Sequence, residues 1–359
     1  GAAAGSGGAA AGSGGAAGSA GNPSPSMRWV GRIDTRKLDA IAFSWQGTGF
    51  VATVAGTAVG IKLRTEDTDT VFFQPVIDGK PATRFEIKSG ADRTVMIATG
   101  LSDGDHRVEL YRETEGAFGT STFLGFTSGT LKAAPSASGR RIEVVGDSIS
   151  AGYGNLGMEP HPNWVANPAC SYTAANSSWY KTYASIAGRA LNAEVSTIAR
   201  SGWGMYRDAD GATSNVLPSL YDRTIGGAGM PMFGFEPKVD AVIVNLGTND
   251  WAKGDPGAAY EAAYKSFVEH VRAKYPDAWI FLTIGSMLDG TKSTQCKTRL
   301  QNVLNALASD KKLVTFDLGM QDLGADGTVP TGCDWHPSVA DHERMAELLK
   351  QQLTAKLGW

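Results

Sequence analysis

The sequence predicts an α/β protein in which a mainly parallel sheet with crossover helices follows a small all-β sandwich of the jelly-roll type. Residues 27–135 contain short runs rich in β-branched and aromatic residues, separated by turn residues and lacking a helical period. From residue 139 onward, short apolar runs alternate with amphipathic segments of helical length. Several of these runs end in small and polar residues, at the sheet edge where open α/β folds carry their chemistry.

The first 26 residues differ from both parts. They consist almost wholly of Gly, Ala, Ser and Pro, so they have little to bury and are expected to form a disordered linker. Such a segment is either an engineered tail or a tether to another module or a surface anchor. The predicted division is therefore linker 1–26, β-sandwich (jelly-roll) domain 27–135 and α/β domain 139–359.

The strands of the sandwich are predicted from their β-branched and aromatic residues. In order they are 40–45, 50–63, 71–77, 94–98 and 106–111. Asp78-Gly79 follows the third strand, and an Asp-Gly pair between two strand-like runs predicts a hairpin with a type I′ turn.

In the second part, strands and helices are expected to alternate. The predicted strands are 142–145, 194–199, 241–246, 279–284 and 313–318, and the predicted helices are 176–191, 256–275, 293–308 and 338–356. Pro256 stands at the start of its helix, where the missing N–H needs no partner. Because the strands are expected to be parallel, their carboxyl ends should meet at one edge.

Composition excludes several classes of function. With 359 residues and 42% hydrophobic content the chain can bury a large core, and its net charge of −3 indicates no basic face for nucleic acid or an anionic membrane. No apolar run reaches the length of a membrane span. The first residues lack a signal peptide, so we expect a chain that is either cytosolic or already processed.

Ser148 is the first candidate for a nucleophile. It follows an apolar run that ends in Gly146-Asp147-Ser148, so its side chain is expected at the carboxyl edge of a strand. The segment departs from the hydrolase elbow Gly-x-Ser-x-Gly, because position 150 is Ser. By itself, Ser148 could simply cap a turn.

Three further motifs change that interpretation. They are Gly202, Gly247-x-Asn249-Asp250 and His336. The order and spacing of these three motifs and of Gly146–Ser148 resemble the blocks of the GDSL esterases, also called SGNH hydrolases. A preceding sandwich and the segment Gly332-Cys-Asp-Trp-His-Pro337 resemble carbohydrate esterase family 2 more narrowly. This resemblance implies a flavodoxin-like three-layer α/β/α catalytic domain.

The resemblance also implies roles for these residues. His336 would accept the Ser148 proton as the hydroxyl oxygen attacks an ester, giving an acetyl-enzyme. The N–H groups of Ser148 and Gly202 and the Asn249 amide would form the oxyanion hole. No cofactor and no metal are implied, and no metal-binding motif such as His-Glu-x-x-His occurs.

One position departs from the superfamily pattern, which places an Asp three residues before the histidine. That position is Cys333, whereas Asp334 lies two residues before His336. Two arrangements stay open at this stage: Asp334 orients the imidazole, or a main-chain carbonyl does so and the enzyme works with a Ser-His dyad.

The tryptophans and cysteines give further expectations. Trp203, Trp251 and Trp335 each adjoin a motif, where they either pack in the core or form a wall on which a sugar stacks. Of the three cysteines, Cys296 and Cys333 are expected to form a disulfide that pins the histidine loop, leaving Cys170 free. A disulfide favours a secreted protein.

The sequence thus predicts a secreted, extracytoplasmic bacterial-type serine esterase that removes O-acetyl groups from plant polysaccharides such as glucomannan or xylan. The family resemblance implies a preference for 6-O-acetyl groups. Its expected partner is the acetylated polysaccharide, with no nucleic acid and no membrane, and with a further module or anchor beyond the linker. The alternatives are an SGNH esterase acting on peptidoglycan acetyl groups or lipid, and a non-catalytic carbohydrate-binding protein.

Overall fold

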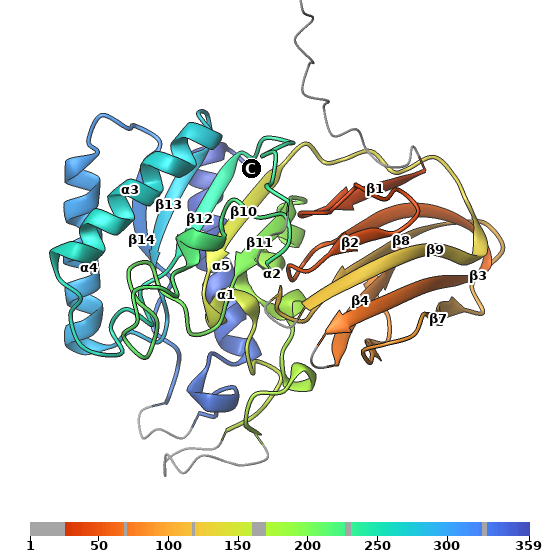
Figure 1. Ribbon diagram of the computed structural model, residues 1–359, viewed down its shortest axis with the longest axis horizontal. Coiled ribbons are helices and arrows are strands. Elements are labelled where there is room, and N and C mark those ends of the chain that lie inside the picture. The colour runs from red at the N-terminus through yellow and green to blue at the C-terminus, as the bar shows by residue number, and fades with distance from the viewer. Residues whose placement is uncertain (1–25, 68–69, 117–118, 160–169, 227–230, 325–328) are drawn as a thin grey trace, which may run out of the picture.

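The computed structural model describes residues 26–67, 70–116, 119–159, 170–226, 231–324 and 329–359. The predicted linker therefore lies almost entirely outside the described residues. Two sheets stand side by side, an antiparallel one built from the first third of the chain and a parallel one flanked by helices (Figure 1). This arrangement confirms the predicted fold class, while the predicted domain limits stay a prediction.

Nine strands form the antiparallel sheet. They are β1 Met27–Val30, β2 Ile41–Phe43, β3 Gly49–Asp67, β4 Val71–Ile77, β5 Lys80–Pro81, β6 Phe85–Ile87, β7 Arg93–Thr99, β8 Asp105–Arg112 and β9 Gly119–Leu131. The first half of β3 pairs with β1 and β8, and its second half pairs with β7; β9 pairs with the second half and also with Val54 and Ala55. The sheet thus folds over a core rich in phenylalanine.

The hairpin predicted at Asp78-Gly79 is confirmed. Both residues have positive φ, 50° and 76°, as a type I′ turn requires, and Ile77 pairs with Lys80 across the turn.

The parallel sheet has the order β11-β10-β12-β13-β14. Its strands are β10 Arg141–Gly146, β11 Glu194–Ala199, β12 Ala241–Asn245, β13 Trp279–Ile284 and β14 Leu313–Asp317, and its helices are α1 Ser148–Ala151, α2 Tyr183–Ala190, α3 Ala258–Lys274, α4 Gly290–Ala306 and α5 Val339–Leu357. Alternate strand residues face opposite sides, so that Val244 packs toward α3 and α4 while Ile243 packs toward α2 and α5. The parallel sheet is therefore the middle of three layers, with α3 and α4 on one face and α2 and α5 on the other.

The helix predicted at 176–191 is shorter than expected. Two short 3-10 turns, Ala174–Asn176 and Trp179–Lys181, precede α2, which begins at Tyr183. The side chains of Thr173, Ser178 and Thr182 each accept a bond from a backbone N–H three residues on. Such local bonds compete with a continuous helix and break this segment into steps.

The two sheets are joined by a buried ion pair. Arg32 of the sandwich lies 3.0 Å from Glu143 on β10, and both side chains are almost fully buried. Glu143 also accepts bonds from the hydroxyls of Tyr221 (2.7 Å) and Tyr275 (3.2 Å). Buried charges need partners, and this pair finds them across the two sheets, so the sandwich packs as an integral part of the molecule.

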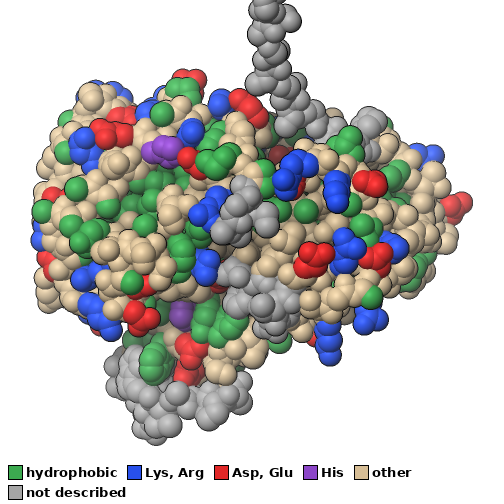
Figure 2. Space-filling view, in the orientation of Figure 1, with side chains coloured by type: hydrophobic (Ala, Val, Ile, Leu, Met, Phe, Trp, Pro, Cys, Tyr) green, Lys and Arg blue, Asp and Glu red, His purple; other side chains and the backbone are tan. Residues whose placement is uncertain are grey.

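The surface has a mixed charge. On the face shown in Figure 2, basic and acidic side chains are interspersed rather than gathered by sign. Within the described ranges, no helix combines the length and the apolar character that crossing a membrane demands.

Candidate active site

Three loops meet at the carboxyl edge of the parallel sheet. Gly146, at the end of β10, pairs with Ala199 of β11 on one side and with Asn245 of β12 on the other. The loops after these strands carry Ser148, Gly202 and Asn249. Strand register therefore brings together the three motifs that the sequence spacing singled out.

Ser148 is the first residue of the short helix α1. Asp147 caps this helix by accepting a bond from the Ile149 N–H at 3.0 Å. A Cβ at Gly146 would overlap the Ser150 side chain, whose hydroxyl lies 2.9 Å from the Tyr183 hydroxyl. Ser at position 150 thus occupies the space behind the turn. Burial raises the pKa of Asp147 to about 7.

His336 faces Ser148. Its Nε2 lies 2.8 Å from the Ser148 Oγ, and its Nδ1 lies 3.0 Å from the main-chain carbonyl oxygen of Asp334. A carbonyl oxygen can only accept, so Nδ1 carries the hydrogen and Nε2 is left to accept the serine proton. Burial lowers the pKa of His336 to about 4, opposed by the contact with Asp334. The neutral imidazole is therefore the ground-state form.

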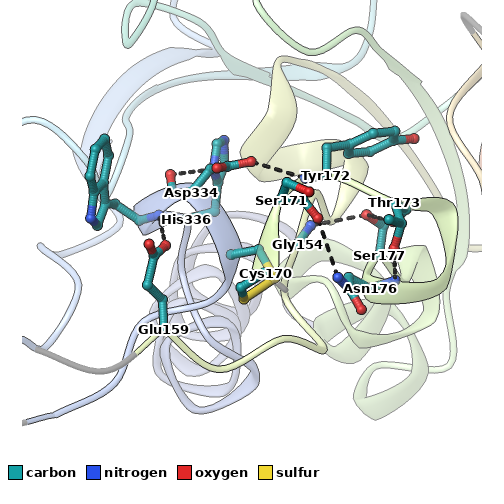
Figure 3. The surroundings of a disulfide bond; sticks show 12 residues. Gly154, Glu159, Cys170, Ser171, Tyr172, Thr173, Asn176, Ser177, Asp334 and His336 are labelled. Carbon is teal, nitrogen blue, oxygen red and sulfur yellow. Dashed lines mark hydrogen bonds between the residues drawn. A yellow bond between two sulfur atoms is a disulfide. The ribbon is translucent and has the colours of Figure 1, made fainter. Parts of the chain in front are cut away.

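The carboxylate of Asp334 is directed elsewhere. It accepts a bond from the Tyr172 N–H at 3.1 Å, which Figure 3 shows, and another from the Tyr153 hydroxyl at 2.6 Å. Of the two arrangements left open by the sequence, the main-chain carbonyl holds the imidazole, and the expectation of Asp334 as the orienting acid is wrong. The physical reason is local: Asp334 and Trp335 have φ of 51° and 58°, which turns the carbonyl toward His336 and the side chain toward Tyr153.

Both main-chain polar groups of the next residue, Trp335, are held as well. The Trp335 N–H donates to Glu159 at 3.1 Å, as Figure 3 shows, and its carbonyl accepts from the Gln321 side chain at 3.0 Å. Left-handed conformations are strained for residues other than glycine and persist where neighbours fix them. The histidine loop is fixed in this way on each side.

A disulfide ties the same loop to the segment after Ser148, but with a partner other than the one predicted. Cys333 bonds to Cys170, with 4.8 Å between the Cα atoms, and the expected Cys296–Cys333 pair is wrong. Cys296 lies buried inside α4, where its sulfur is 3.9 Å from the Tyr260 hydroxyl. Burial raises the pKa of this thiol to about 12, so it stays protonated.

The corner at Gly202 requires glycine for its backbone. Its φ is 79°, and a Cβ there would meet no described protein atom within 4 Å. The left-handed conformation, rather than protein crowding, therefore explains the residue. The Asn249 amide donates one hydrogen to the carbonyl of Trp203 at 3.0 Å. Asp250 of the same motif accepts from the N–H groups of Met205, Tyr206 and Arg207 and so holds this loop.

The three tryptophans have different environments. Trp251 is fully buried, packs edge-on against Tyr260 and donates to Gln295 at 3.1 Å, so its expected role in a sugar wall is wrong. Trp251 lies in the apolar core beneath the loop that carries Asn249. Its position next to a motif did not specify whether its side chain would be buried or exposed. Trp203 is half-buried, with the Arg200 guanidinium 4.3 Å from its ring. Trp335 is 37% exposed.

Sequence reasoning missed two aromatic residues of the site. The ring of Tyr153 lies 4.2 Å from that of His336 and 4.6 Å from that of Tyr172, measured between centroids. Tyr153 stands between two glycines five residues after Ser148, which was the available signal. Within the described ranges, no three His, Cys, Asp or Glu side chains form a group that could hold a metal.

The comparisons with known proteins agree with this site. The GDSL-like lipase/acylhydrolase family model matches residues 144–344, which is the class that the sheet edge and the Ser148–His336 pair define. The carbohydrate esterase 2 N-terminal model matches residues 29–136. The chain belongs to carbohydrate esterase family 2.

Three relatives illustrate the similarity. The structure of a family two carbohydrate esterase from Clostridium thermocellum, in complex with cellohexaose, is 33% identical, covers 93% of this chain and 99% of its own, and superposes with a TM-score of 0.84. The cellulase/esterase CelE of Acetivibrio thermocellus is 33% identical over 94% of this chain, which spans 40% of the length of CelE. An acetylxylan esterase / glucomannan deacetylase of Cellvibrio japonicus is 26% identical over 93% of this chain and 90% of its own length.

Proposed function

We propose that the protein is a serine esterase that removes acetyl groups from plant cell-wall polysaccharides, acetylated glucomannan and xylan among them. The observation that carries the proposal is the line of contacts from Ser148 Oγ through the His336 ring to the Asp334 carbonyl. Such a line is what nucleophilic attack by a hydroxyl requires, namely an acceptor for its proton that is itself held in one tautomer.

In the proposed reaction, Ser148 Oγ attacks the acetyl carbonyl while its proton moves to His336 Nε2. The tetrahedral intermediate then collapses, and the imidazolium returns the proton to the departing sugar oxygen. A water molecule next attacks the acetyl-enzyme, again with His336 as base, and releases acetate. The Asp334 carbonyl would stabilise the imidazolium through the Nδ1–H bond and needs no carboxylate partner.

The developing oxyanion would be bound by three donors. These are the N–H groups of Ser148 and Gly202 and the second hydrogen of the Asn249 amide, whose first hydrogen is bound to Trp203. Each such donor contributes about 10²–10³ in rate. Because the amide is already anchored by one bond, it is preorganised to receive the charge with the other.

The substrate assignment rests on the relatives and on the aromatic surface. The Clostridium thermocellum relative holds cellohexaose, and the Cellvibrio japonicus protein is an acetylxylan esterase / glucomannan deacetylase. Trp335 is exposed and next to His336, and its ring offers a face on which a sugar can stack. Trp203, next to Gly202, is half-buried and offers a second ring. A preference for 6-O-acetyl groups and an extracytoplasmic location, which the disulfide favours, belong to the same proposal.

The test is release of acetate from acetylated glucomannan and acetylated xylan, by wild type and Ser148→Ala, with a chelator present. We expect release by wild type and a fall of about 10³-fold or more in the variant. Cleavage of an aryl acetate alone would leave the serine mechanism and overturn the substrate. Inactivity of the wild type on all three would favour a binding protein instead.

The pH profile gives an independent check on the histidine. His336 acts as a base only when neutral, and its pKa is lowered by burial to about 4. Activity should therefore persist as pH falls below 6 and be lost as it passes through about 4. The measurement is kcat/KM against pH between 3 and 8 with a soluble aryl acetate, since this ratio reports the free enzyme. An acid limb at the ordinary histidine value near 6.5 would contradict the buried, neutral imidazole.

A further inference from the structure

The β-sandwich reaches the predicted oxyanion corner through one buried carboxylate. Glu115 lies in the connection between β8 and β9 and is 5% exposed. One of its oxygens accepts from the Ser201 N–H at 2.8 Å, and the other accepts from the Ser201 hydroxyl. Both carboxylate oxygens thus bind one residue of the α/β domain, the neighbour of Gly202.

Glu115 is itself held rigidly. Arg112, fully buried at the end of β8, donates to the carbonyls of Thr114 at 3.0 Å and Glu115 at 3.3 Å. The next residue, Gly116, donates its N–H to the side chain of Gln46. Gln46 in turn donates to the carbonyl of Ala199, the last residue of β11, at 3.1 Å. The sandwich therefore holds the strand end as well as the corner, along the sheet edge nearest to it in Figure 1.

The corner needs such an anchor because of its own chemistry. Gly202 adopts a left-handed conformation, and glycine is the residue whose backbone is least restricted. The direction of the Gly202 N–H depends on the peptide that joins it to Ser201. Glu115 fixes this peptide on its N-terminal side, and the bond from the Ala209 N–H to the Gly202 carbonyl, 2.9 Å, fixes the other side.

We propose that Glu115 is a positioning residue of the esterase, which holds Ser201 so that the Gly202 N–H points at the oxyanion. The sandwich thereby completes the active site from outside the catalytic domain. This inference rests on the proposed function, since it assigns a task in ester hydrolysis. A preorganised donor loses most of its effect when misplaced, and errors of about 1 Å cost about 10²-fold in rate.

The test compares two isosteric replacements. In Glu115→Gln the amide oxygen can accept from the Ser201 N–H and the amide nitrogen can donate to the hydroxyl, so both contacts are retained without the charge. In Glu115→Met the side chain has similar volume but leaves the buried N–H without an acceptor. We expect kcat on an aryl acetate to fall by about 10-fold or more in Met, with KM changed less than about 3-fold, and to return to within about 3-fold of wild type in Gln.

Glu113→Met is the matched control. Glu113 is buried on the same connection but accepts from the Tyr180 N–H at 3.3 Å, on the α2 side. We expect its melting temperature to fall while kcat stays within about 2-fold of wild type, because its partner is remote from the corner. A purely structural role for Glu115 would make the two Met variants alike.

The outcomes separate the inference from the proposed function. An active wild type with equal kcat in Glu115→Met, or a Gln variant as slow as Met, overturns the positioning role alone. An inactive wild type overturns the proposed function instead. Should Glu115→Met fail to fold, Ser201→Ala removes the hydroxyl contact from the other side. We expect kcat to fall by about 3-fold or more, and an unchanged kcat would contradict the proposal.

Discussion

Replacing His336 with alanine is expected to lower kcat by about 10⁴-fold or more, whereas Asp334→Asn should lower it by less than about 10-fold. The difference follows from the contacts. His336 is the one described side chain within hydrogen-bond reach of the Ser148 Oγ, at 2.8 Å, while the imidazole is oriented by a main-chain oxygen that the Asn substitution leaves in place. The measurement is kcat and KM on an aryl acetate for both variants.

The smaller loss in Asp334→Asn would come from the loop. The carboxylate accepts from Tyr153 and Tyr172, and an amide offers one oxygen instead of two. A loss near 10⁴-fold, the size found when a triad acid is neutralised, would show that the carboxylate orients the imidazole during catalysis. For His336→Ala, partial rescue by added imidazole is the control that separates a missing base from a misfolded loop.

Removal of the disulfide in a Cys170→Ala/Cys333→Ala variant is expected to lower the free energy of unfolding by about 3–5 kcal/mol and kcat by about 10-fold. The bond closes a long loop, because its cysteines are 163 positions apart in the sequence, so its loss frees the unfolded chain. Cys333 also immediately precedes Asp334, whose carbonyl holds His336, and its N–H donates to the Gly154 carbonyl at 2.9 Å. Denaturant titration and kcat measure the two effects.

Cys296 offers the matched control for this prediction. It is buried and takes no part in the disulfide. The Cys296→Ala variant should therefore have the kcat of wild type and, like wild type, should lose activity when a reductant is added. The Cys170→Ala/Cys333→Ala variant should instead be insensitive to the reductant. If Cys296→Ala, rather than the Cys170→Ala/Cys333→Ala variant, made the enzyme insensitive to the reductant, the Cys170–Cys333 bond would be contradicted.

Short-range patterns in the sequence were enough for much of the fold. The Asp78-Gly79 turn, the alternation of strands and helices, and the Gly-Asp-Ser turn after β10 each depend on residues that are neighbours in the chain. The candidates Ser148, Gly202 and Asn249 follow strands of the parallel sheet, whereas His336 and the roles of all four residues came from the resemblance to the GDSL esterases. Parallel strands end at one edge, so motifs placed directly after strands converge without further information.

Only the tertiary structure decided which groups meet across the fold. The bond of Cys333 to Cys170, the burial of Trp251 and the use of the Asp334 carbonyl rather than its carboxylate all depend on how distant loops pack. Glu115 is the clearest case, since it lies 86 positions from Ser201, in the connection between two strands of the antiparallel sheet. Chain neighbours determine turns and periodicity, but a buried polar group takes its partner from whatever the packing places beside it. The sequence by itself therefore determined the candidates for the reacting side chains, and the packed structure determined what holds them in place.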